Sequence, residues 1–470
     1  MNRTYFGTDG IRGPYGGPIV NEVFTNRLGV AAGRWLDRQV AAGRQPRKVL
    51  VGWDTRSSGE LLADSIALGL AREGWLPEPL GVLPTPAIAR AVGKSGAPLG
   101  VAITASHNPA SDNGFKLFSR GGRKLTDSEE AEVERMLPGP GEEVGPGSND
   151  RGKASGGSQW RAADRKEAGS SRAADFRNDY VAAACSILPP GALKGWRIAL
   201  DTANGATCAT STAAFQVLGA DVMALGNTPD GSNINAGVGS EFPELLCSRV
   251  IAGGGRVGIA HDGDGDRCVV CDERGELLDG DELLGILAIR ALERGTLAAR
   301  TLVTTVQSNL GLDMAVKAAG GRVVRTPVGD RYVIEGMLAE GATLGGESSG
   351  HVIFSEIGPT GDGLVAALKL IEVMLETGKP LSQLRRGIAK FPQATASLFV
   401  REKKPLGDLP ALSAAVEAVE SEFGTLGRVL VRYSGTQSML RLLVEGPDVQ
   451  SVRSGLDRLV AAAGKELDLT

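Results

Sequence analysis

Short runs of consecutive apolar residues alternate with helix-like segments over the first three quarters of the chain. KVLVGWD (48–54) and PLGVAITAS (98–106) are two such runs. SSGELLADSIALGLAREG (57–74), between them, repeats its apolar positions at nearly 3.6 residues and begins with serines that can cap a helix. Strands that are apolar throughout are buried on both faces, so the pattern predicts mixed or parallel sheets covered by helices.

The alternation recurs through the middle of the chain. Five further runs predict strands, with helical stretches between most of them: WRIALDTA (196–203), ADVMAL (220–225), RVGIAHD (256–262), TLVTTVQS (301–308) and RVVRTPV (322–328). In open sheets of this kind, ligands bind at the loops that follow the carboxyl ends of strands. We therefore expect the functional residues in those loops.

Two segments depart from this alternation. Residues 138–175 are rich in Gly, Ser, Pro and charge and predict a linker or mobile loop, with a domain boundary inside or beside it. From about residue 385 the order strand, helix, strand, strand, helix predicts a small α+β domain. A chain of 470 residues is too long for one core and predicts roughly three or four domains.

Composition and charge restrict the class of protein. The chain is 42% hydrophobic, and its net charge of −4 argues against a broad nucleic-acid interface, which is normally basic. No apolar run reaches the ~18 residues of a membrane helix, and the N-terminus lacks a secretory signal pattern. Five cysteines without framework spacing suit a reducing cytosol, so we expect a cytoplasmic protein without nucleic-acid or membrane partners.

The stretch IAHDGDGDR places three carboxylates, Asp262, Asp264 and Asp266, on alternate residues after an apolar run. Such close like charges are unfavourable unless a cation offsets them, so a metal site is favoured over a solvated acidic turn. A calcium loop is the alternative, since Glu273 falls at its twelfth position. Arg267 occupies the position where that loop needs glycine, and strands flank it instead of helices, so the oxygen ligands favour Mg²⁺.

The loop TASHNPASDNGFK (104–116) follows an apolar strand and carries a serine where that strand ends. The Ser106 hydroxyl is suited to act as a nucleophile or phosphoryl carrier, with His107 and Lys116 nearby for proton transfer or charge. By itself the loop is more typical of an Asn-Pro turn in which the serine caps the backbone.

Two further loops allow ligand binding and an ordinary turn about equally. In LGGESSGHVIF (344–354), Glu347, Ser349 and His351 alternate and would share one polar edge, suited to sugar hydroxyls, if the segment is extended. The segment VRYSGTQSMLR (431–441) offers guanidinium, hydroxyl and amide donors suited to a phosphate monoester: Arg432, Ser434, Gly435, Thr436 and Arg441. Arg12, between glycines near the start of the chain, is a weaker phosphate candidate.

Taken together and in order, these stretches resemble the α-D-phosphohexomutase superfamily, and within it the subgroup that acts on glucosamine phosphates. The resemblance covers nearly the whole chain and rests on FGTDGIRG (6–13), TASHNP (104–109), DNGFK (112–116), DTANGA (201–206), PDGSNIN (229–235), DGDGDR (262–267), TPVGDRYV (326–333), GESSGH (346–351) and RYSGT (432–436).

The resemblance implies an α/β fold of three similar mixed-sheet α/β domains plus a smaller C-terminal α+β domain, arranged around a central cleft. The expected ranges and their loops are 1–155 with the phosphoserine loop, 156–277 with the metal loop, 278–384 with the sugar-binding loop and 385–470 with the phosphate-binding loop.

The resemblance also implies a reaction, the interconversion of glucosamine 6-phosphate and glucosamine 1-phosphate. It would proceed through phosphoserine 106 and a bisphosphorylated sugar, with Mg²⁺ and a sugar 1,6-bisphosphate activator. The implied catalytic residues are Ser106, Lys116, His107 and Arg267, and the metal ligands Ser106, Asp262, Asp264 and Asp266. Substrate would be bound by Arg12, Glu347, Ser349, His351, Arg432, Ser434, Gly435, Thr436 and Arg441.

Three departures from the family pattern leave the sugar preference and the phosphate clamp open. The last loop continues with Gln437 and Ser438 in place of Glu-Pro, Ser348 replaces a glutamine, and the linker after residue 150 is longer than usual. The alternatives are a phosphomannomutase/phosphoglucomutase, a non-catalytic phosphosugar-binding protein and a calcium-binding module. The oligomeric state stays open, a homodimer included.

Overall fold

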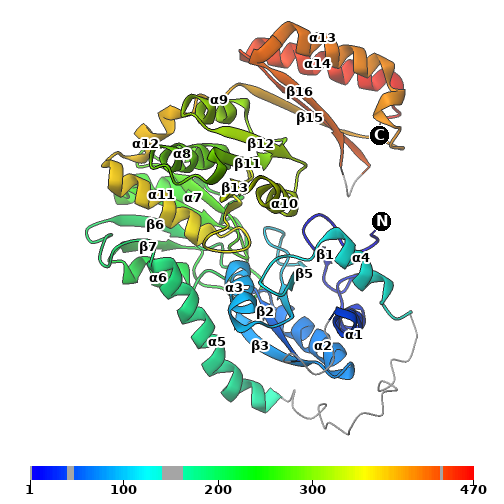
Figure 1. Ribbon diagram of the computed structural model, residues 1–470, viewed down its shortest axis with the longest axis vertical. Coiled ribbons are helices and arrows are strands. Elements are labelled where there is room, and N and C mark those ends of the chain that lie inside the picture. Colours follow the sequence, from blue (N-terminus) through cyan, green and yellow to red (C-terminus); the bar gives the residue numbers. More distant parts are fainter. Residues whose placement is uncertain (1–2, 40–46, 140–161, 435–437, 470) are drawn as a thin grey trace.

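The computed structural model describes residues 3–39, 47–139, 162–434 and 438–469, with the backbone alone for 162–173. The chain builds four separate β-sheets with helices packed against them (Figure 1). The parts built on these sheets are called the first to fourth domains below. Within the described residues, no helix has both the length and the apolar character that crossing a membrane requires.

The first domain has a five-stranded sheet in the order β1-β5-β4-β2-β3. Its strands are β1 (Ile11–Pro14), β2 (Lys48–Trp53), β3 (Leu76–Val82), β4 (Leu99–Ile103) and β5 (Asp112–Ser119), and its helices α1 (Glu22–Gln39), α2 (Gly59–Arg72), α3 (Thr85–Ser95) and α4 (Asp127–Arg135). Strand β2 runs parallel to β3 and β4, whereas β4 and β5 form an antiparallel hairpin. The predicted strands 48–54 and 98–106 and the helix between them are confirmed.

The second and third domains repeat this connection. The second has β6 (Arg197–Asp201), β7 (Asp221–Leu225), β8 (Val257–His261), β9 (Cys268–Cys271) and β10 (Leu277–Leu278), with α5 (Ala162–Cys185), α6 (Ser211–Val217) and α7 (Glu244–Gly253). The third has β11 (Thr301–Thr305), β12 (Arg322–Thr326), β13 (Leu344–Gly346) and β14 (Val352–Phe354), with α8 (Gly280–Glu293), α9 (Leu310–Ala318), α10 (Asp330–Glu340), α11 (Gly363–Thr377) and α12 (Leu381–Leu384).

In each of the three domains, two parallel crossovers through helices are followed by one antiparallel hairpin. The hairpin turns β4–β5, β8–β9 and β13–β14 each begin at the carboxyl end of a parallel strand, where ligand-binding loops are expected. These three turns carry the serine, the three aspartates and the Glu347–His351 segment. The topology therefore gives the three loops equivalent positions.

The fourth domain is a small antiparallel sheet in the order β15-β17-β16 with its own hydrophobic core. Its elements are β15 (Gln393–Phe399), α13 (Pro410–Phe423), β16 (Arg428–Tyr433), β17 (Met439–Glu445) and α14 (Val449–Glu466). The predicted α+β order is confirmed, and so is the fold class of three similar α/β domains with a smaller C-terminal one. The limits of the four expected ranges stay predictions.

The linker predicted at 138–175 is wrong for its last part. Helix α5 begins at Ala162, so the Gly- and Ser-containing stretch from there onward is helical and continues into the second domain. Residues 140–161 lie outside the described part of the chain. Tertiary contacts explain the difference, since α5 packs on β3, α3, α6 and α11, and packing overrides local propensity.

A buried carboxylate joins the fourth domain to the third. Glu445 is fully buried and accepts hydrogen bonds from the Leu310 amide and from Nε of Arg428, both at 2.6 Å. Arg428 also donates to the carbonyl of Val306 at 2.8 Å. Glu445 thus satisfies donors from both domains at their contact.

Glu445→Ala leaves the Arg428 charge and the Leu310 amide without their acceptor, so we expect the free energy of unfolding to fall by about 3–5 kcal/mol. Urea unfolding followed by circular dichroism measures the change. The control is Glu422→Ala, which removes an exposed ion pair with Arg458 in the same domain and should cost less than about 1 kcal/mol. Equal losses in the two variants would contradict the assignment.

Candidate active site

Ser106 begins the β4–β5 turn with a left-handed backbone. Its φ is +52°, a conformation that costs a residue with a Cβ about 1–3 kcal/mol and that recurs at functional sites. The Ser106 amide donates to Thr104 Oγ1 at 2.9 Å, and Thr104 donates to Asp54 at 2.6 Å. The hydroxyl of the buried Ser106 donates to Asp262 Oδ2 at 2.5 Å, which joins the first loop to the second.

Two buried side chains hold the backbone around Ser106 in place. The guanidinium of Arg56 donates to the carbonyls of Ser106, Asn108 and Asp112 at 3.0, 2.8 and 2.9 Å. From the second domain, the amide of Asn235 donates to the carbonyls of Ser106 and Asn108 at 2.8 and 3.0 Å. These bonds offset the backbone strain and fix the direction of the serine hydroxyl.

The three aspartates of the β8–β9 turn lie together and are buried. One carboxylate oxygen from each of Asp262, Asp264 and Asp266 falls within 4.8 Å of the others. Burial, and then the charges of Asp264 and Asp266, raise the pKa of Asp262 to about 8. Thr85 from the first domain donates to Asp264 at 2.6 Å. The three carboxylates therefore repel one another, as the sequence predicted, and nearby positive charges are needed to offset the repulsion.

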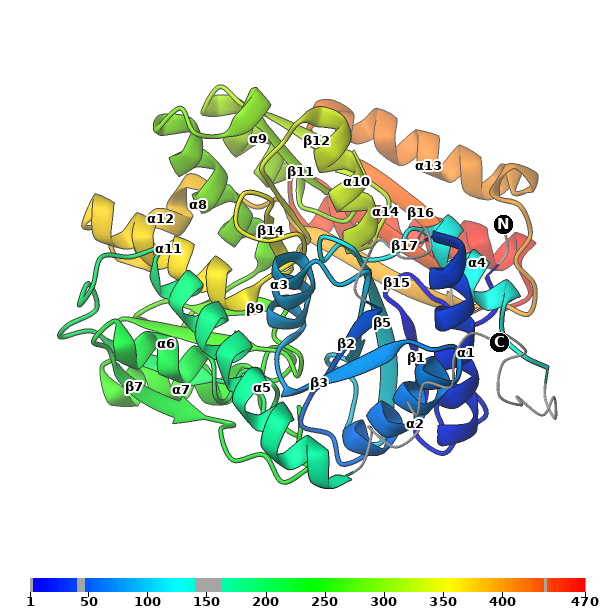
Figure 2. The same cartoon turned by 60° about the horizontal axis from the view of Figure 1, so that its bottom comes forward.

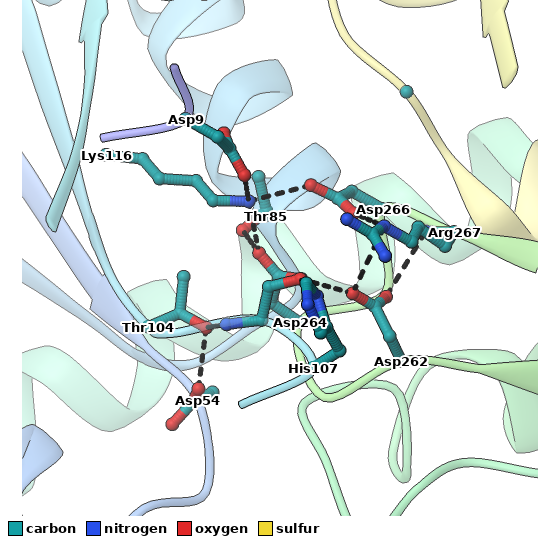
Figure 3. A network of polar contacts seen from close by, with 12 residues as sticks. Asp9, Asp54, Thr85, Thr104, His107, Lys116, Asp262, Asp264, Asp266 and Arg267 are labelled. Carbon is teal, nitrogen blue, oxygen red and sulfur yellow. Dashed lines mark hydrogen bonds and ion pairs between the residues drawn. The ribbon is translucent and has the colours of Figure 1, made fainter. Parts of the chain in front are cut away.

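Two cations flank the triad (Figure 3). Lys116 Nζ lies 2.8 Å from Asp264 and 2.7 Å from Asp266, and Arg267 lies 4.0 Å from Asp262. Burial alone would lower the pKa of Lys116, but Asp264 and Asp266 outweigh it and raise this pKa well above its ordinary value. Lys116 thus stays charged and is better suited to stabilise negative charge than to exchange a proton.

The triad also fits a divalent cation. Oδ1 of Asp264 is buried and has no hydrogen-bond partner among the described residues. Unpartnered carboxylate oxygens are costly in a protein interior, and an oxygen-only ligand set suits a hard cation. Strands flank the turn on both sides, which excludes the helix–loop–helix arrangement of a calcium loop.

The first and second loops each carry one histidine: His107 lies next to the Ser106 hydroxyl, and His261 lies next to the Arg267 carbonyl. His107 Nδ1 lies 3.4 Å from Ser106 Oγ, and burial followed by the charges of Arg267 and Arg12 lowers its pKa to about 4, so the ring is neutral at pH 7. His261 is fully buried, with Nδ1 3.1 Å from the Arg267 carbonyl and a pKa lowered to about 4 by burial. His107 is therefore available for chemistry, whereas His261 supports the metal loop.

The Glu347–His351 segment is a tight turn and not the extended edge considered from the sequence. The Glu347 amide donates to the His351 carbonyl at 2.9 Å, and the Gly350 amide donates back to Glu347 at 3.1 Å. The turn brings Nδ1 of His351 to 3.5 Å from Asp266, so the third loop reaches the triad. The turn excludes a regular alternation of side chains along one edge.

An open groove of about 770 Å³ runs beside the triad and connects the first three domains. Its lining includes His107 from the first loop, Arg267 from the second and Ser349 from the third. The carboxylate of Glu347 accepts from the Gly329 amide at 3.1 Å, and burial raises its pKa. The groove is the place where a polar ligand can meet residues of all three loops.

The fourth loop is separate from this centre. Arg432 and Arg441 are cross-strand partners in the β16–β17 hairpin, and burial followed by the charge of Arg441 lowers the pKa of Arg432. Within the described residues, no polar contact joins Arg432, Ser434 or Arg441 to the Ser106 centre. Gly435 and Thr436 lie outside the described residues.

Arg12 does reach the centre, through a residue that the sequence analysis did not single out. Its guanidinium pairs with Asp9, whose carboxylate lies 3.3 Å from Lys116 Nζ. Arg56 and Asn235, which hold the serine loop, were also missed. Arg56 lies three residues after the end of β2 and could have been found by its place after the carboxyl end of a strand.

Family models match three parts of the chain. Domain I of phosphoglucomutase/phosphomannomutase, an alpha/beta/alpha domain, matches residues 3–141, domain III matches 279–391, and the C-terminal domain matches 372–462. A phosphoglucosamine mutase of Moorella thermoacetica is 43% identical over 461 residues, which cover 97% of this chain and 99% of that protein. One of Anaeromyxobacter dehalogenans is 41% identical and covers 98% of each chain.

Solved structures share the fold. A putative phosphomannomutase from Thermus thermophilus superposes with a TM-score of 0.74 at 22% identity and covers 98% of both chains. The N-acetylphosphoglucosamine mutase of Aspergillus fumigatus in complex with GlcNAc-6P and magnesium superposes with a TM-score of 0.63 at 18% identity, covering 98% of this chain and 96% of that one.

Mg²⁺ should stabilise the protein, because it offsets three buried like charges. At a hundredfold excess over its dissociation constant, the gain is about 2.7 kcal/mol and raises the thermal midpoint. Asp264→Asn should remove this gain, whereas Asp221→Asn, an exposed change in the same domain, should retain it. A gain produced by Ca²⁺ alone, or one that survives Asp264→Asn, would contradict the site.

Proposed function

The chain belongs to the phosphoglucomutase/phosphomannomutase family, and on that basis we propose that it interconverts glucosamine 6-phosphate and glucosamine 1-phosphate. The activity is that of a phosphoglucosamine mutase, an isomerase that works by phosphoryl transfer. The observation that carries the proposal is the contact of the Ser106 hydroxyl with the buried triad. Ser106 Oγ donates to Asp262 Oδ2 at 2.5 Å, and Lys116 Nζ donates to Asp264 of the same triad. Relatives of that activity match nearly the whole chain.

The reaction takes place in two transfers. Phosphoserine 106 gives its phosphoryl group to the O1 hydroxyl of glucosamine 6-phosphate, so that an O1–P bond forms while the Oγ–P bond breaks and O1 loses its proton. The bisphosphate then turns round, the Ser106 Oγ–P bond re-forms while the O6–P bond breaks, and O6 takes up the proton that O1 had given up. The product is glucosamine 1-phosphate with the phosphoserine restored, and a free sugar 1,6-bisphosphate serves as activator of the unphosphorylated enzyme.

The residues of the centre divide this work. Lys116 and Arg267 stabilise the negative charge of the moving phosphoryl group, which is the main requirement of phosphoryl transfer. His107, neutral at pH 7 and beside the serine, accepts the O1 proton. Asp262, Asp264 and Asp266 would hold Mg²⁺ together with the serine's phosphate, and the ion would supply further charge neutralisation.

Substrate recognition is assigned to the other loops. Glu347, Ser349 and His351 are assigned to the sugar hydroxyls, with Ser349 lining the groove, and Arg12 contributes a cation near the centre. The phosphate that is not being transferred is bound by the fourth loop, through Arg432, Ser434, Gly435, Thr436 and Arg441. Two adjacent arginines with no acidic partner among the described residues support an anion at that hairpin.

The partners and location follow from the same function. We propose a small-molecule hexosamine phosphate as the only substrate class, a cytoplasmic location and no nucleic-acid or membrane partner. A homodimer is compatible with the fold. The second candidate activity is that of a phosphomannomutase/phosphoglucomutase, favoured by Ser348 in the groove at a position where the glucosamine subgroup has glutamine.

Turnover of three substrates decides between the two activities. We expect kcat/KM on glucosamine 6-phosphate to exceed the values on glucose and mannose 6-phosphates by at least about tenfold, each measured with its bisphosphate activator, because a polar site discriminates by the groups it pairs. Equal or higher kcat/KM on glucose or mannose 6-phosphate would replace the proposed activity by the second one.

Ser106→Ala removes the phosphoryl carrier but no charge, so we expect turnover to be abolished while phosphosugar binding is retained. Coupled assay measures the first and calorimetry the second. Intact-mass analysis after incubation with bisphosphate should show one phosphate on the wild type and none on the variant. Ser111→Ala, an exposed serine of the same loop, is the control. Full activity in Ser106→Ala would make the chain's phosphoserine role untenable.

A further inference from the structure

Six charged or titratable side chains form a closed ring through the junction of the first three domains. Acidic and basic groups alternate around it, in the order Asp266, Lys116, Asp9, Lys124, Asp330, His351 and back to Asp266. The first domain supplies Asp9, Lys116 and Lys124, the second Asp266, and the third Asp330 and His351. The function proposed above uses Asp266, Lys116 and His351 but gives no role to Lys124 and Asp330.

The contacts around the ring are direct. Lys116 Nζ lies 2.7 Å from Oδ2 of Asp266 and 3.3 Å from Asp9. Lys124 is buried and pairs with both Asp9 and Asp330. His351 closes the ring, with Nε2 3.5 Å from Asp330 and Nδ1 3.5 Å from Oδ1 of Asp266. The Gly361 amide lies 3.2 Å from the same Nε2, so a neutral ring accepts from Gly361 and a protonated ring faces Asp330.

The ring fixes Asp266 from two sides. Lys116 reaches one carboxylate oxygen from the first domain, and His351 reaches the other from the third. Lys124 links the far ends of these two arms, because Asp9 contacts Lys116 and Asp330 contacts His351. Buried groups are screened little by water, so the arms are electrostatically coupled over the whole path.

We propose that Lys124 and Asp330 are positioning residues for phosphoryl transfer, which hold Lys116 and His351 in place on Asp266 by bridging the first and third domains. The proposal rests on the proposed function, since it concerns the same centre. Neither residue contacts Ser106 or the aspartate triad, so both act through the residues they orient. Partners of this kind typically change activity by about 10- to 100-fold when they are removed.

The structure offers a matched control for a merely structural role. Arg331, the next residue after Asp330, pairs with Glu130 of the first domain at 2.5 Å, with side chains 5% and 3% exposed. This pair bridges the same two domains and is as deeply buried. Among the described contacts of the pair, the one with the ring is made by the Arg331 backbone amide, which donates to Asp330 at 2.9 Å and which a side-chain substitution retains.

Steady-state kinetics with the best of the three hexose 6-phosphates is the first test. We expect Lys124→Met and Asp330→Asn each to lower kcat by about 10- to 100-fold with little change in KM. The double variant should lower kcat no further than the more damaging single variant, because both substitutions break the same Lys124–Asp330 ion pair. It also removes both charges together, so it serves where a single variant fails to fold. Glu130→Gln/Arg331→Met should keep the wild-type kcat.

Histidine resonances give a second test that needs no substrate. The chain has three histidines, so ¹³C-histidine labelling yields three ring signals, and His351→Gln together with His107→Gln assigns all three. At fixed pH, Lys124→Met and Asp330→Asn should each shift the His351 signal and leave the His261 signal in place. The control variant Glu130→Gln/Arg331→Met should leave the His351 signal in place.

A wild-type kcat in both single variants, an equal loss in the control pair, or an unmoved His351 signal would each overturn the proposal. Failure of the proposed function is a different result, in which the wild-type enzyme turns over none of the three sugar phosphates. In that case the His351 signal still tests whether Lys124 and Asp330 position His351.

Discussion

The burial of three carboxylates in one short turn is the constraint on which the arrangement of the domains depends. Each ionised group withdrawn from water costs several kcal/mol unless an opposite charge comes close to it. The turn itself supplies only Arg267, so the other cations come from elsewhere in the sequence. Lys116 arrives from the first domain and His351 from the third. The aspartate turn therefore depends on the neighbouring domains for the groups that offset its charge.

The repeated topology makes this convergence achievable. In each α/β domain the same antiparallel hairpin follows the third parallel strand, and its turn leaves the sheet at the carboxyl edge. Each of the three α/β domains in Figure 2 contributes one such turn, and the three turns bring Ser106, the aspartate triad and His351 together at one junction. The fourth domain is joined to the third through Glu445 and Arg428 and stays apart from this centre in the described contacts.

The sequence predicted those parts of the fold that local patterns encode. Runs such as KVLVGWD and the alternate aspartates are local, so the strands, the fold class and the buried triad were found. The sequence left a turn and an extended edge about equally open at Glu347, because the hydrogen bonds of the turn close only once β13 and β14 pair. The helical residues from Ala162 were missed because packing, and not their Gly- and Ser-containing composition, decides their conformation.

Long-range pairs left no trace in local patterns. A lysine such as Lys124 resembles any surface lysine in sequence, and Asp330 stands 206 residues further along the chain. Arg56 and Asn235 are similar cases, since their acceptors are backbone carbonyls of a distant loop. The partners of such residues become visible only once the chain is folded.

The spacing of the charged ring along the chain has a consequence for synthesis. During synthesis, the ring residues of the first domain leave the ribosome before the aspartate turn: Asp9, Lys116 and Lys124. The two ring residues of the third domain, Asp330 and His351, leave it later, after several more strands and helices. Domains fold largely in the order in which they emerge. In the nascent first and second domains, Lys124 and Asp266 therefore each lack one partner until the third domain folds and supplies Asp330 and His351.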